Sequence, residues 1–264
     1  MGTDGLDTHL FTWRADNYGV LLRDVASGRL ACVDAGEADA VLEAIGAVGA
    51  RPEDLTHLLI THHHDDHRAG MRRVKEATGC TIVGSAANPA SKTTANDYDL
   101  TVSEGDVLDF SGHRIEFIQT PGHTLDMINP YLPDAGLLFT GDTLFMLGCG
   151  RLFEGDARMM HASLAKLKAL PPETMVFCGH EYTETNAGFA LTVDPHNAAL
   201  QRRAERIRAA RAAGEPTVPA RLAEELATNP FLRTDDAGIR EALGMAEADD
   251  VAVFAEIRRR RDGW

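Results

Sequence analysis

The chain has 264 residues and a formal net charge of -14 at pH 7, with 44% hydrophobic and 25% charged residues. These values are typical of a globular protein with one large domain, or one domain and an appendage. An acidic chain with a pI of about 5.2 is a poor general binder of nucleic acid or of an anionic membrane surface. Its apolar runs are all shorter than the roughly 18 residues of a membrane span.

The N-terminal segment MGTDGLDTHLF is acidic and lacks the basic and apolar regions of a secretory signal, so we expect a cytoplasmic protein. The four cysteines are Cys32, Cys80, Cys149 and Cys178, and they form no CxxC pair. This spacing argues against a disulfide framework and against a thiolate zinc site. We expect each cysteine to be a small buried residue.

The first 180 residues alternate short apolar runs with amphipathic segments, which favours an α/β layered domain. The apolar runs predict strands at Val20–Leu22, Leu30–Val33, Leu58–Ile60, Thr81–Val83, Val107–Phe110, Ile115–Ile118, Leu137–Phe139 and Met175–Phe177. The amphipathic segments predict helices at Ala38–Val48, Arg68–Ala77 and Ala157–Lys168. Ser111 and Gly112 indicate the turn of a hairpin between two of the strands.

The character of the sequence changes after about Tyr182, where strand-like runs stop and alanine, arginine and glutamate dominate. The segment NAALQRRAERIRAARAAG predicts a helix that ends at Gly214. PTVP at 216–219 breaks the chain, and two or three more helices are expected before Trp264. We therefore divide the chain into a first domain at 1–182 and a helical C-terminal domain at 183–264.

Four histidines and two aspartates crowd into residues 61–67, directly behind the apolar run at 58–60. So many polar groups at the end of a buried strand need a reason, because burying them without partners costs free energy. Alternate side chains of an extended segment share a face. His62 and His64 are therefore expected to point the same way, and His63 away from them.

A helix that starts near Asp66 places that carboxylate in its first turn, where the helix dipole favours negative charge. Asp66 and His67 then reach the same cavity as the two preceding histidines. Four ligands exceed the three that a catalytic zinc usually takes from protein, which indicates two metals. A solvated loop rich in His and Asp is the alternative interpretation. His63 and Asp65 are expected to lie outside the ligand set or to face solvent.

Three further candidate ligands follow predicted strands through turns that contain glycine. TPGHT places His123 after one strand, FTGDT places Asp142 after the next, and FCGHEYT places His180 after a third. Glycine permits such tight turns and close backbone approach. Together with the cluster, these residues predict a metal site. The remaining histidines have no such context and are expected to be ordinary: His9, His57, His113, His161 and His196.

These residues resemble the metallo-β-lactamase superfamily, whose signature is T-H-x-H-x-D-H followed by later His, Asp and His ligands. The resemblance implies an αββα sandwich. It also implies two metal ions, one bound by His62, His64 and His123, the other by Asp66, His67 and His180, with Asp142 bridging them.

Other segments resemble the glyoxalase II family of hydroxyacylglutathione hydrolases: GCGRLFEG at 148–155, GHEYT at 179–183, TNPFLR at 228–233, PTVP, and the ending FAEIRRRRDGW. The resemblance spans nearly the whole chain, including the helical appendage that most of the superfamily lacks. It implies a metal-binding catalytic domain at 1–182 and a glutathione-binding domain at 183–264.

The same resemblance implies glutathione contacts for Tyr182, Arg258 and Arg261, and a basic contact for Arg151. Phe153 stands where some relatives have tyrosine, so a hydroxyl contact is missing there. Arg258 and Arg261 are three residues apart and share a helical face, and arginine binds carboxylates with two hydrogen bonds. The alternative is that this basic run only complements a helix C-terminus.

The chain departs from the family pattern directly after His123. The family usually follows PGHT-x with Gly-His, whereas this chain has Asp126 and Met127, then Asn129 and Pro130. The shape of this loop and the acyl-group preference are therefore open.

The implied activity is metal-dependent hydrolysis of S-2-hydroxyacylglutathione thioesters, such as the S-lactoylglutathione of methylglyoxal detoxification. A hydroxide bridging the two ions would be the nucleophile, with catalytic roles for Asp66 and Asp142. Imidazole and carboxylate ligands suit zinc, iron or manganese, and zinc is expected. The expected partner is the small thioester, with no nucleic acid and no membrane, and the protein is expected to be a monomer.

Alternative functions remain. Persulfide dioxygenases use one iron and similar ligands, but that branch tends to have Asp-Phe-Gln after GCGR, where this chain has Leu152, Phe153 and Glu154, and it lacks the long helical tail. A lactonase or a nucleic-acid phosphodiesterase fits poorly with the acidic charge and the tail. A non-catalytic metal or glutathione sensor would not need the complete ligand set.

Overall fold

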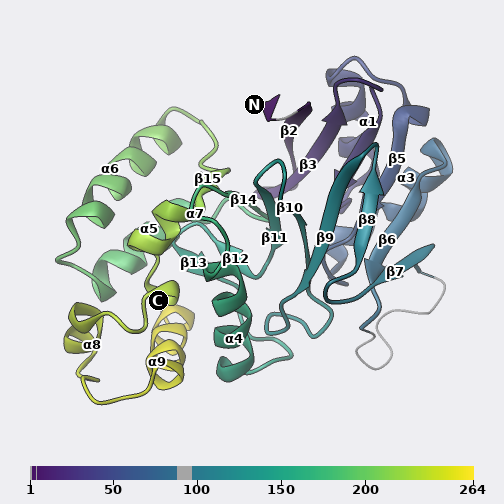
Figure 1. The fold of residues 1–264 in the computed structure, drawn as a ribbon. Helices are drawn as coiled ribbons and strands as arrows, with labels where there is room; N and C mark the ends of the chain where they lie inside the picture. The colour runs from purple at the N-terminus through teal and green to yellow at the C-terminus, as the bar shows by residue number, and fades with distance from the viewer. Residues whose placement is uncertain (1, 4, 88–96) are drawn as a thin grey trace. The chain divides into compact units, whose positions relative to one another are not determined.

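The computed structural model describes residues 2–3, 5–87 and 97–264 (Figure 1). The chain divides into two compact units. Unit 1 consists of Met1–Gln119 and Leu125–Gly141, and unit 2 of Thr120–Thr124 and Asp142–Trp264. Every helix within the described ranges is too short or too polar to span a lipid bilayer.

Unit 1 contains a seven-stranded sheet whose strands lie side by side in chain order. Neighbouring strands are antiparallel from β1 to β4 and parallel from β4 to β7. The strands are β1 (Gly2–Thr3), β2 (Leu6–Trp13), β3 (Asn17–Asp24), β4 (Leu30–Val33), β5 (Leu55–Leu59), β6 (Thr81–Ser85) and β7 (Leu100–Val102).

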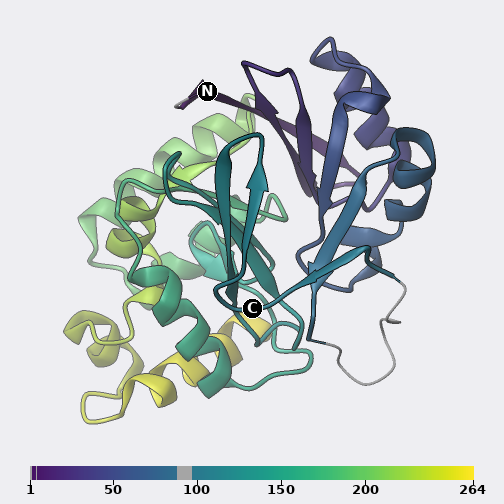
Figure 2. The same ribbon diagram turned by 45° about the vertical axis from the view of Figure 1, so that its right-hand side comes forward.

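A second group of strands in unit 1 is antiparallel throughout. It consists of β8 (Val107–Phe110), β9 (His113–Gln119), β10 (Ile128–Leu132) and β11 (Leu137–Gly141). It packs against the first sheet, because the ring of Phe110 lies 6.1 Å from that of His57 on β5. In Figure 2 these strands and the helices of unit 1 lie on opposite sides of the seven-stranded sheet.

Two helices cover the outer face of the seven-stranded sheet, α1 (Ala38–Ala47) and α3 (Met71–Thr78) (Figures 1 and 2). Val41 of α1 and Val74 of α3 are fully buried in one apolar cluster with Leu58 of β5. Burying each such side chain contributes about 1.5–3 kcal/mol. Shorter helical turns precede α3, namely η1 (Pro52–Asp54) and α2 (Asp65–Arg68).

Unit 2 is mainly helical. Its elements are β12 (Leu144–Phe145), β13 (Gly148–Cys149), α4 (Ala157–Lys168), β14 (Met175–Cys178), α5 (Thr183–Val193), α6 (Ala198–Ala212), β15 (Ala220–Arg221), α7 (Leu222–Thr228), η2 (Pro230–Leu232), α8 (Ala237–Leu243) and α9 (Asp250–Asp262). The antiparallel pairs β12–β13 and β14–β15 are its strands. The helices predicted for the C-terminal part of the chain therefore lie in the same unit as α4 and β14.

A buried ion pair links two helices of unit 2 to the segment that follows Asp142. Arg203 of α6 pairs with Glu225 of α7, and both side chains are almost fully buried. Glu225 also accepts hydrogen bonds from the backbone N–H of Leu147 at 2.8 Å and from Asn229 Nδ2 at 2.9 Å. A buried charge needs such partners, so this network fixes the backbone between β12 and β13.

Most predicted elements are present. β4, β8 and α4 occupy the predicted residues, and the chain turns between β8 and β9 at Ser111 and Gly112, both with positive φ. The helix predicted within 197–214 is α6, which ends at Ala212, and Gly214 has a φ of +74°. The prediction that strands stop after Tyr182 is wrong for β15.

The helix predicted at Arg68–Ala77 is wrong at its start, because the chain forms α2 and α3 with a break at Gly70. The Gly70 N–H bonds to the carbonyl of Ala35 at 2.8 Å. A Cβ at this glycine would lie 2.5 Å from the backbone nitrogen of Ala38. Close packing against the start of α1 therefore interrupts the helix.

The sequence analysis predicted no strand at β2, β7 or β10, nor at the two-residue strands β1, β12 and β13. β10 contains Pro130, and proline within an apolar run argues against an interior strand because it donates no ladder hydrogen bond. In the structure Pro130 lies opposite Phe117 of β9, and every residue of β10 is buried.

Candidate metal-binding residues

The histidine cluster of unit 1 lies between the end of β5 and α2. His62 Nε2 is 3.1 Å from His64 Nδ1, and the rings of His62 and His67 are 4.2 Å apart between centroids. His62 and His67 are buried. The three imidazoles therefore come together, as the alternation of side chains and the start of a helix near Asp66 predict.

Asp66 is held in the first turn of α2 by residues from the β2–β3 hairpin. Trp13 Nε1 donates to the Asp66 carbonyl at 2.9 Å, and Asn17 Nδ2 donates to Asp66 Oδ2 at 3.1 Å. Gly36 leaves room for this turn, because a Cβ there would lie 2.0 Å from the Asp66 carbonyl oxygen. Asp66 Oδ2 is 3.5 Å from His67 Nε2, so both can serve one cation.

Asp34, which the sequence analysis did not select, orients His67. Its Oδ2 accepts a hydrogen bond from His67 Nδ1 at 2.8 Å, and its two oxygens also accept from the N–H and hydroxyl of Thr61 at 2.8 and 2.9 Å. With the proton fixed on Nδ1, the Nε2 lone pair of His67 is available to a metal. The sequence signal was present: Asp34 directly follows an apolar strand, as Asp142 does.

His63 does not face solvent, and its ring lies edge-on to that of His64 with 5.1 Å between centroids. Its side chain is buried, and its Nδ1 lies 2.9 Å from Oδ1 of Asp126, which is also buried. Asp65, by contrast, is exposed. The two residues expected to lie outside the ligand set thus differ in environment.

Unit 2 brings together the three candidates that are dispersed in the sequence. Oδ2 of Asp142 is 3.4 Å from Nε2 of His123 and 3.4 Å from Nε2 of His180, and all three residues are buried. One carboxylate oxygen thus lies at the same distance from two imidazole nitrogens, so the carboxylate and each imidazole are close enough to bind the same cation. The donor set therefore fits a divalent metal.

Backbone groups support these side chains of unit 2. His123 Nδ1 donates to the carbonyl of Arg151 at 2.8 Å, which directs Nε2 toward Asp142. A Cβ at Gly150 would lie 2.0 Å from the Asp142 carbonyl oxygen and 3.0 Å from His123 Nδ1. Only glycine fits this approach of two backbone segments.

Aromatic rings accompany both histidines of unit 2. The rings of His180 and Tyr182 are stacked, with 4.7 Å between centroids and an interplanar angle of 4°. Phe153 lies 5.2 Å from His123 by ring centroid, and its side chain is 62% exposed. These are two of the predicted substrate contacts, and the structure places each beside a candidate ligand.

Arg258 of α9 is buried and lies behind β13. Its Nη1 donates to the Cys149 carbonyl at 2.8 Å, its Nη2 pairs with Asp262 at 2.8 Å, and its guanidinium lies 5.2 Å from the Phe231 ring centroid. Its observed partners make it a support for the backbone beside Gly150. Its contact with substrate stays a prediction.

Arg261 of α9 is half-buried. It donates to Asn186 Oδ1 at 3.2 Å and lies over the rings of Phe189 and Trp264, at 5.9 and 5.5 Å from their centroids. Burial, with the nearby charge of Arg258, lowers the pKa of Arg261. Arg151 is exposed, and its Nε is 4.0 Å from an Asp262 oxygen.

The cysteines are all free and buried, as predicted. Burial raises the pKa of Cys149 to about 11 and that of Cys178 to about 12. Thiolates are therefore disfavoured at both positions, which agrees with a ligand set of nitrogen and oxygen alone.

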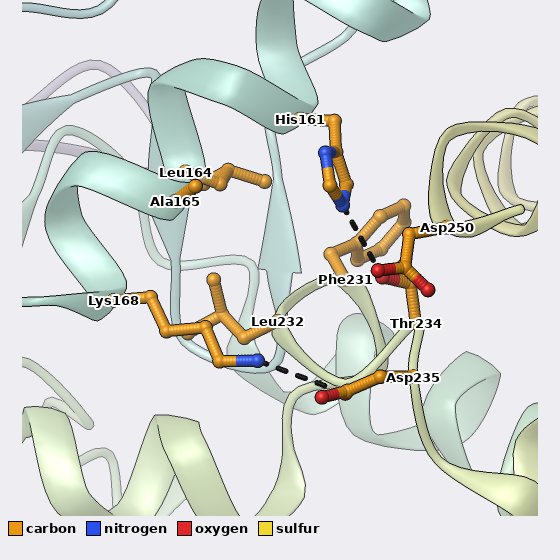
Figure 3. A pocket seen from close by; sticks show the side chains of 9 residues that line it. All are labelled: His161, Leu164, Ala165, Lys168, Phe231, Leu232, Thr234, Asp235 and Asp250. Carbon is orange, nitrogen blue, oxygen red and sulfur yellow. Dashed lines mark hydrogen bonds and ion pairs between the residues drawn. The ribbon is translucent and has the colours of Figure 1, made fainter.

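A cavity of about 190 Å³ in unit 2 involves none of the predicted site residues (Figure 3). Four of its polar residues interact in pairs: His161 Nε2 is 3.3 Å from Thr234 Oγ1, and Lys168 Nζ is 3.6 Å from Asp235 Oδ1. The lining residues are His161, Leu164, Ala165, Lys168, Phe231, Leu232, Thr234, Asp235 and Asp250.

Two family models match the sequence. Residues 21–180 match the metallo-β-lactamase superfamily, and residues 181–264 match the C-terminus of hydroxyacylglutathione hydrolase. The two matches meet close to the boundary proposed at 182, although the contact-based units divide the chain elsewhere. The domain division itself stays a prediction.

Curated relatives cover nearly the whole chain. The hydroxyacylglutathione hydrolase of Chelativorans sp. (strain BNC1) is 52% identical over 257 residues, 97% of this chain and 98% of the relative. That of Rhizobium meliloti (strain 1021) is 51% identical over 259 residues, 98% and 99% of the two chains.

Among solved structures, ETHE1 from Myxococcus xanthus superimposes with a TM-score of 0.65 at 24% identity, covering 96% of this chain and 89% of its own. At that identity the likeness shows the fold alone. With the matching family model, it confirms the expected metallo-β-lactamase fold, a mixed α/β architecture followed by a helical C-terminal region.

Proposed function

The chain belongs to the hydroxyacylglutathione hydrolase family of thioester hydrolases, within the metallo-β-lactamase superfamily, and on that premise we propose that it cleaves S-2-hydroxyacylglutathione thioesters, such as S-lactoylglutathione. The products are glutathione and a 2-hydroxy acid. The observation that carries this substrate is the match of residues 181–264 to the C-terminus specific to that family, with relatives about 50% identical over the full chain.

The superfamily implies divalent metal binding, and we propose two ions, both zinc. Each candidate side chain offers an imidazole nitrogen or a carboxylate oxygen, which suits zinc and also iron or manganese. The orientation of His67 by Asp34 and of His123 by the Arg151 carbonyl supports the assignment. The proposed ligands are His62, His64, Asp66, His67, His123, Asp142 and His180.

When bound, such metals lower the pKa of a water from 15.7 to about 7 and polarise a carbonyl oxygen. Within the chain, Asp34 and the Arg151 carbonyl hold protons on the Nδ1 atoms of His67 and His123, so that each Nε2 atom would be the one to bind a metal. Asp66, fixed by Asn17, would be a metal ligand and would orient the water. Asp142 would be the ligand shared by the two ions, as the family resemblance implies.

The leaving group explains why no further acid is required. A thiol has a free pKa of about 8.5, so the glutathione thiolate departs near neutral pH without full protonation. This agrees with a candidate site whose titratable groups are already engaged as ligands or as supports for ligands.

Glutathione is anionic, and the chain as a whole is acidic, so local cations must attract the substrate. We assign this role to Arg151, which is exposed, and to Arg261, which is half-buried. The positive charge of Arg151 acts on Arg261 and is one of the causes that lower its pKa, after burial and the charge of Arg258. Tyr182 and Phe153 provide aromatic walls beside His180 and His123. Arg258 is the fifth proposed contact.

The test is turnover with S-lactoylglutathione, measured as loss of the thioester and release of free thiol, with oxygen consumption followed in the same sample. Thiol release without oxygen uptake supports the proposal. Oxygen uptake with a glutathione persulfide, and no thioester loss, would assign the chain to dioxygenase chemistry instead.

Metal content is the second measurement. Purified active protein is expected to contain more than one equivalent of zinc, iron and manganese combined, because the candidate ligands are too many for one tetrahedral ion. Full activity at one equivalent would contradict the binuclear site. A cytoplasmic location and a monomeric state remain predictions, the latter to be checked by light scattering.

A further inference from the structure

His63 and Asp126 form a buried pair next to the candidate ligands, since the His63 ring lies 5.1 Å from that of His64 between centroids. His63 Nδ1 lies 2.9 Å from Asp126 Oδ1, and the two residues are only 6% and 1% exposed. Both belong to unit 1. A histidine and a carboxylate are rarely buried together without a reason, because each must give up its hydration.

A second hydrogen bond joins the same two segments. The N–H of Ile128, at the start of β10, donates to the carbonyl of Thr61 at 2.9 Å. The segment at 126–128 is thus tied to residues 61 and 63 by one backbone bond and one side-chain bond. Of these two segments of unit 1, the one at 61–64 carries His62 and His64.

We propose that Asp126 is a positioning residue for the metal ligands: by holding His63, it fixes the backbone that presents His62 and His64. His63 shares a peptide bond with each of these neighbours, so a rotation of residue 63 turns both imidazoles. The inference rests on the metal site proposed above. It gives a role to the Asp126 that stands where the family pattern has glycine.

The pairing is the main constraint on this carboxylate. Oδ2 of Asp126 has no hydrogen-bond partner among the residues that the structure describes, which leaves His63 as the group that Oδ1 contacts. Loss of His63 leaves the carboxylate of Asp126 buried without this hydrogen bond, and loss of Asp126 removes the acceptor that holds His63 Nδ1. We expect the backbone at 61–64 to shift in response, and His62 and His64 to shift with it.

The test compares disruptive with conservative variants. Asp126→Leu and His63→Ala remove the bond, whereas Asp126→Asn and His63→Asn each keep a polar group able to form it. The control is Asp24→Leu, which breaks another His–Asp pair of unit 1, between the buried Asp24 and the partly buried His113, with Nε2 to Oδ1 at 3.1 Å. Asp24 lies at the opposite end of β3 from Asn17.

Two readouts report on the metal site without activity: the rate of zinc release to a chromophoric chelator, and the visible absorption spectrum of the cobalt-substituted protein. Partners that orient metal ligands typically contribute 10–100-fold in metal affinity. We expect Asp126→Leu and His63→Ala to release zinc about 10-fold faster and to alter the cobalt spectrum. The two Asn variants should stay close to wild type.

Asp24→Leu is expected to lower the melting temperature but to leave zinc release and the cobalt spectrum unchanged. The inference is overturned when Asp126→Leu loses stability as Asp24→Leu does while keeping wild-type release and spectrum. If Asp126→Leu does not fold, Asp126→Ser and His63→Ala carry the same comparison. Wild-type protein that takes up no zinc or cobalt contradicts the proposed function first, and the positioning role with it.

Discussion

Unit 1 offers its ligand candidates from a single run, His62–His67, whereas unit 2 offers His123, Asp142 and His180 from three separate turns. The supports differ as well. Side chains hold the run of unit 1, with Asp34 on His67 and Asn17 on Asp66. In unit 2, backbone groups hold the candidate ligands.

The backbone supports of unit 2 are the Arg151 carbonyl, which orients His123, and the close approach of Gly150 to Asp142. A side-chain support is lost through one substitution, but a carbonyl support is lost only when the backbone moves. The candidate ligands of the two units are therefore expected to respond to mutation differently.

The largest effect is expected for Asp142→Ala. Asp142 lies between two imidazoles, so its loss should reduce kcat/KM by more than about 100-fold, above the range for outer supports, and lower the metal content. His63→Ala should cost only about 10-fold. Activity and elemental analysis of the two variants check this, and equal losses would show that the strand alternation was misinterpreted.

Arg261→Ala comes next. A charge-assisted contact contributes roughly 1.5–3 kcal/mol, which corresponds to about 10- to 150-fold in kcat/KM at 1.4 kcal/mol per decade. If the contact is equal in ground and transition states, the loss appears in KM and kcat is nearly unchanged. Steady-state kinetics with a glutathione thioester measure this.

Arg260→Ala is the matched control for Arg261, because Arg260 pairs instead with Glu256 at 2.7 Å. A small neutral thioester without the tripeptide is the control substrate. If Arg260→Ala and Arg261→Ala behave alike with both substrates, the basic end of α9 has no part in binding glutathione.

Asp34→Asn tests the side-chain support of unit 1. Asparagine tolerates the φ of +62° at this position, so the backbone should be retained. An amide no longer provides two ionised acceptors for His67 and Thr61. We expect metal affinity to fall about 10- to 100-fold, measured by chelator competition. Unchanged affinity would mean that His67 needs no orientation.

Gly150→Ala tests the backbone support of unit 2. The added methyl meets the Asp142 carbonyl, and such overpacking costs about 1–3 kcal/mol of unfolding free energy. Gly46→Ala in α1 is the control, because a Cβ there meets nothing within 4 Å and should stabilise by about 0.5–1 kcal/mol. Denaturant titration compares the two. A neutral Gly150→Ala would remove the contrast between the units.

The sequence predicted the run of unit 1 well because its information is local. Four histidines and two aspartates follow one apolar strand within seven residues. Their proximity in sequence predicts a polar site there without knowledge of the rest of the fold. It also found His123, Asp142 and His180, but only through the repeated pattern of strand, glycine and ligand, and through the resemblance. Their convergence on a single carboxylate oxygen depends on long-range packing.

The supports were the part that sequence reasoning missed. Asp34 and Asp126 contact residues far from them in the chain, so neither the position of Asp34 behind an apolar strand nor the departure at Asp126 revealed which histidine each one holds. Arg258 was selected by resemblance for substrate, yet its observed partners are the Cys149 carbonyl and Asp262. Roles that rest on tertiary contacts were thus hidden, as was β10, whose Pro130 contradicted a strand.

The buried pair of Arg203 and Glu225 has a consequence for protein engineering. Because Glu225 also holds the Leu147 N–H, a chain cut after residue 182 would leave Leu147 without that acceptor and Cys149 without Arg258. The C-terminal helices therefore cannot be removed or transferred without disturbing the segment at 144–151. A chimera that grafts them onto another scaffold must carry residues 144–151 as well, or supply a replacement loop with its own internal partners.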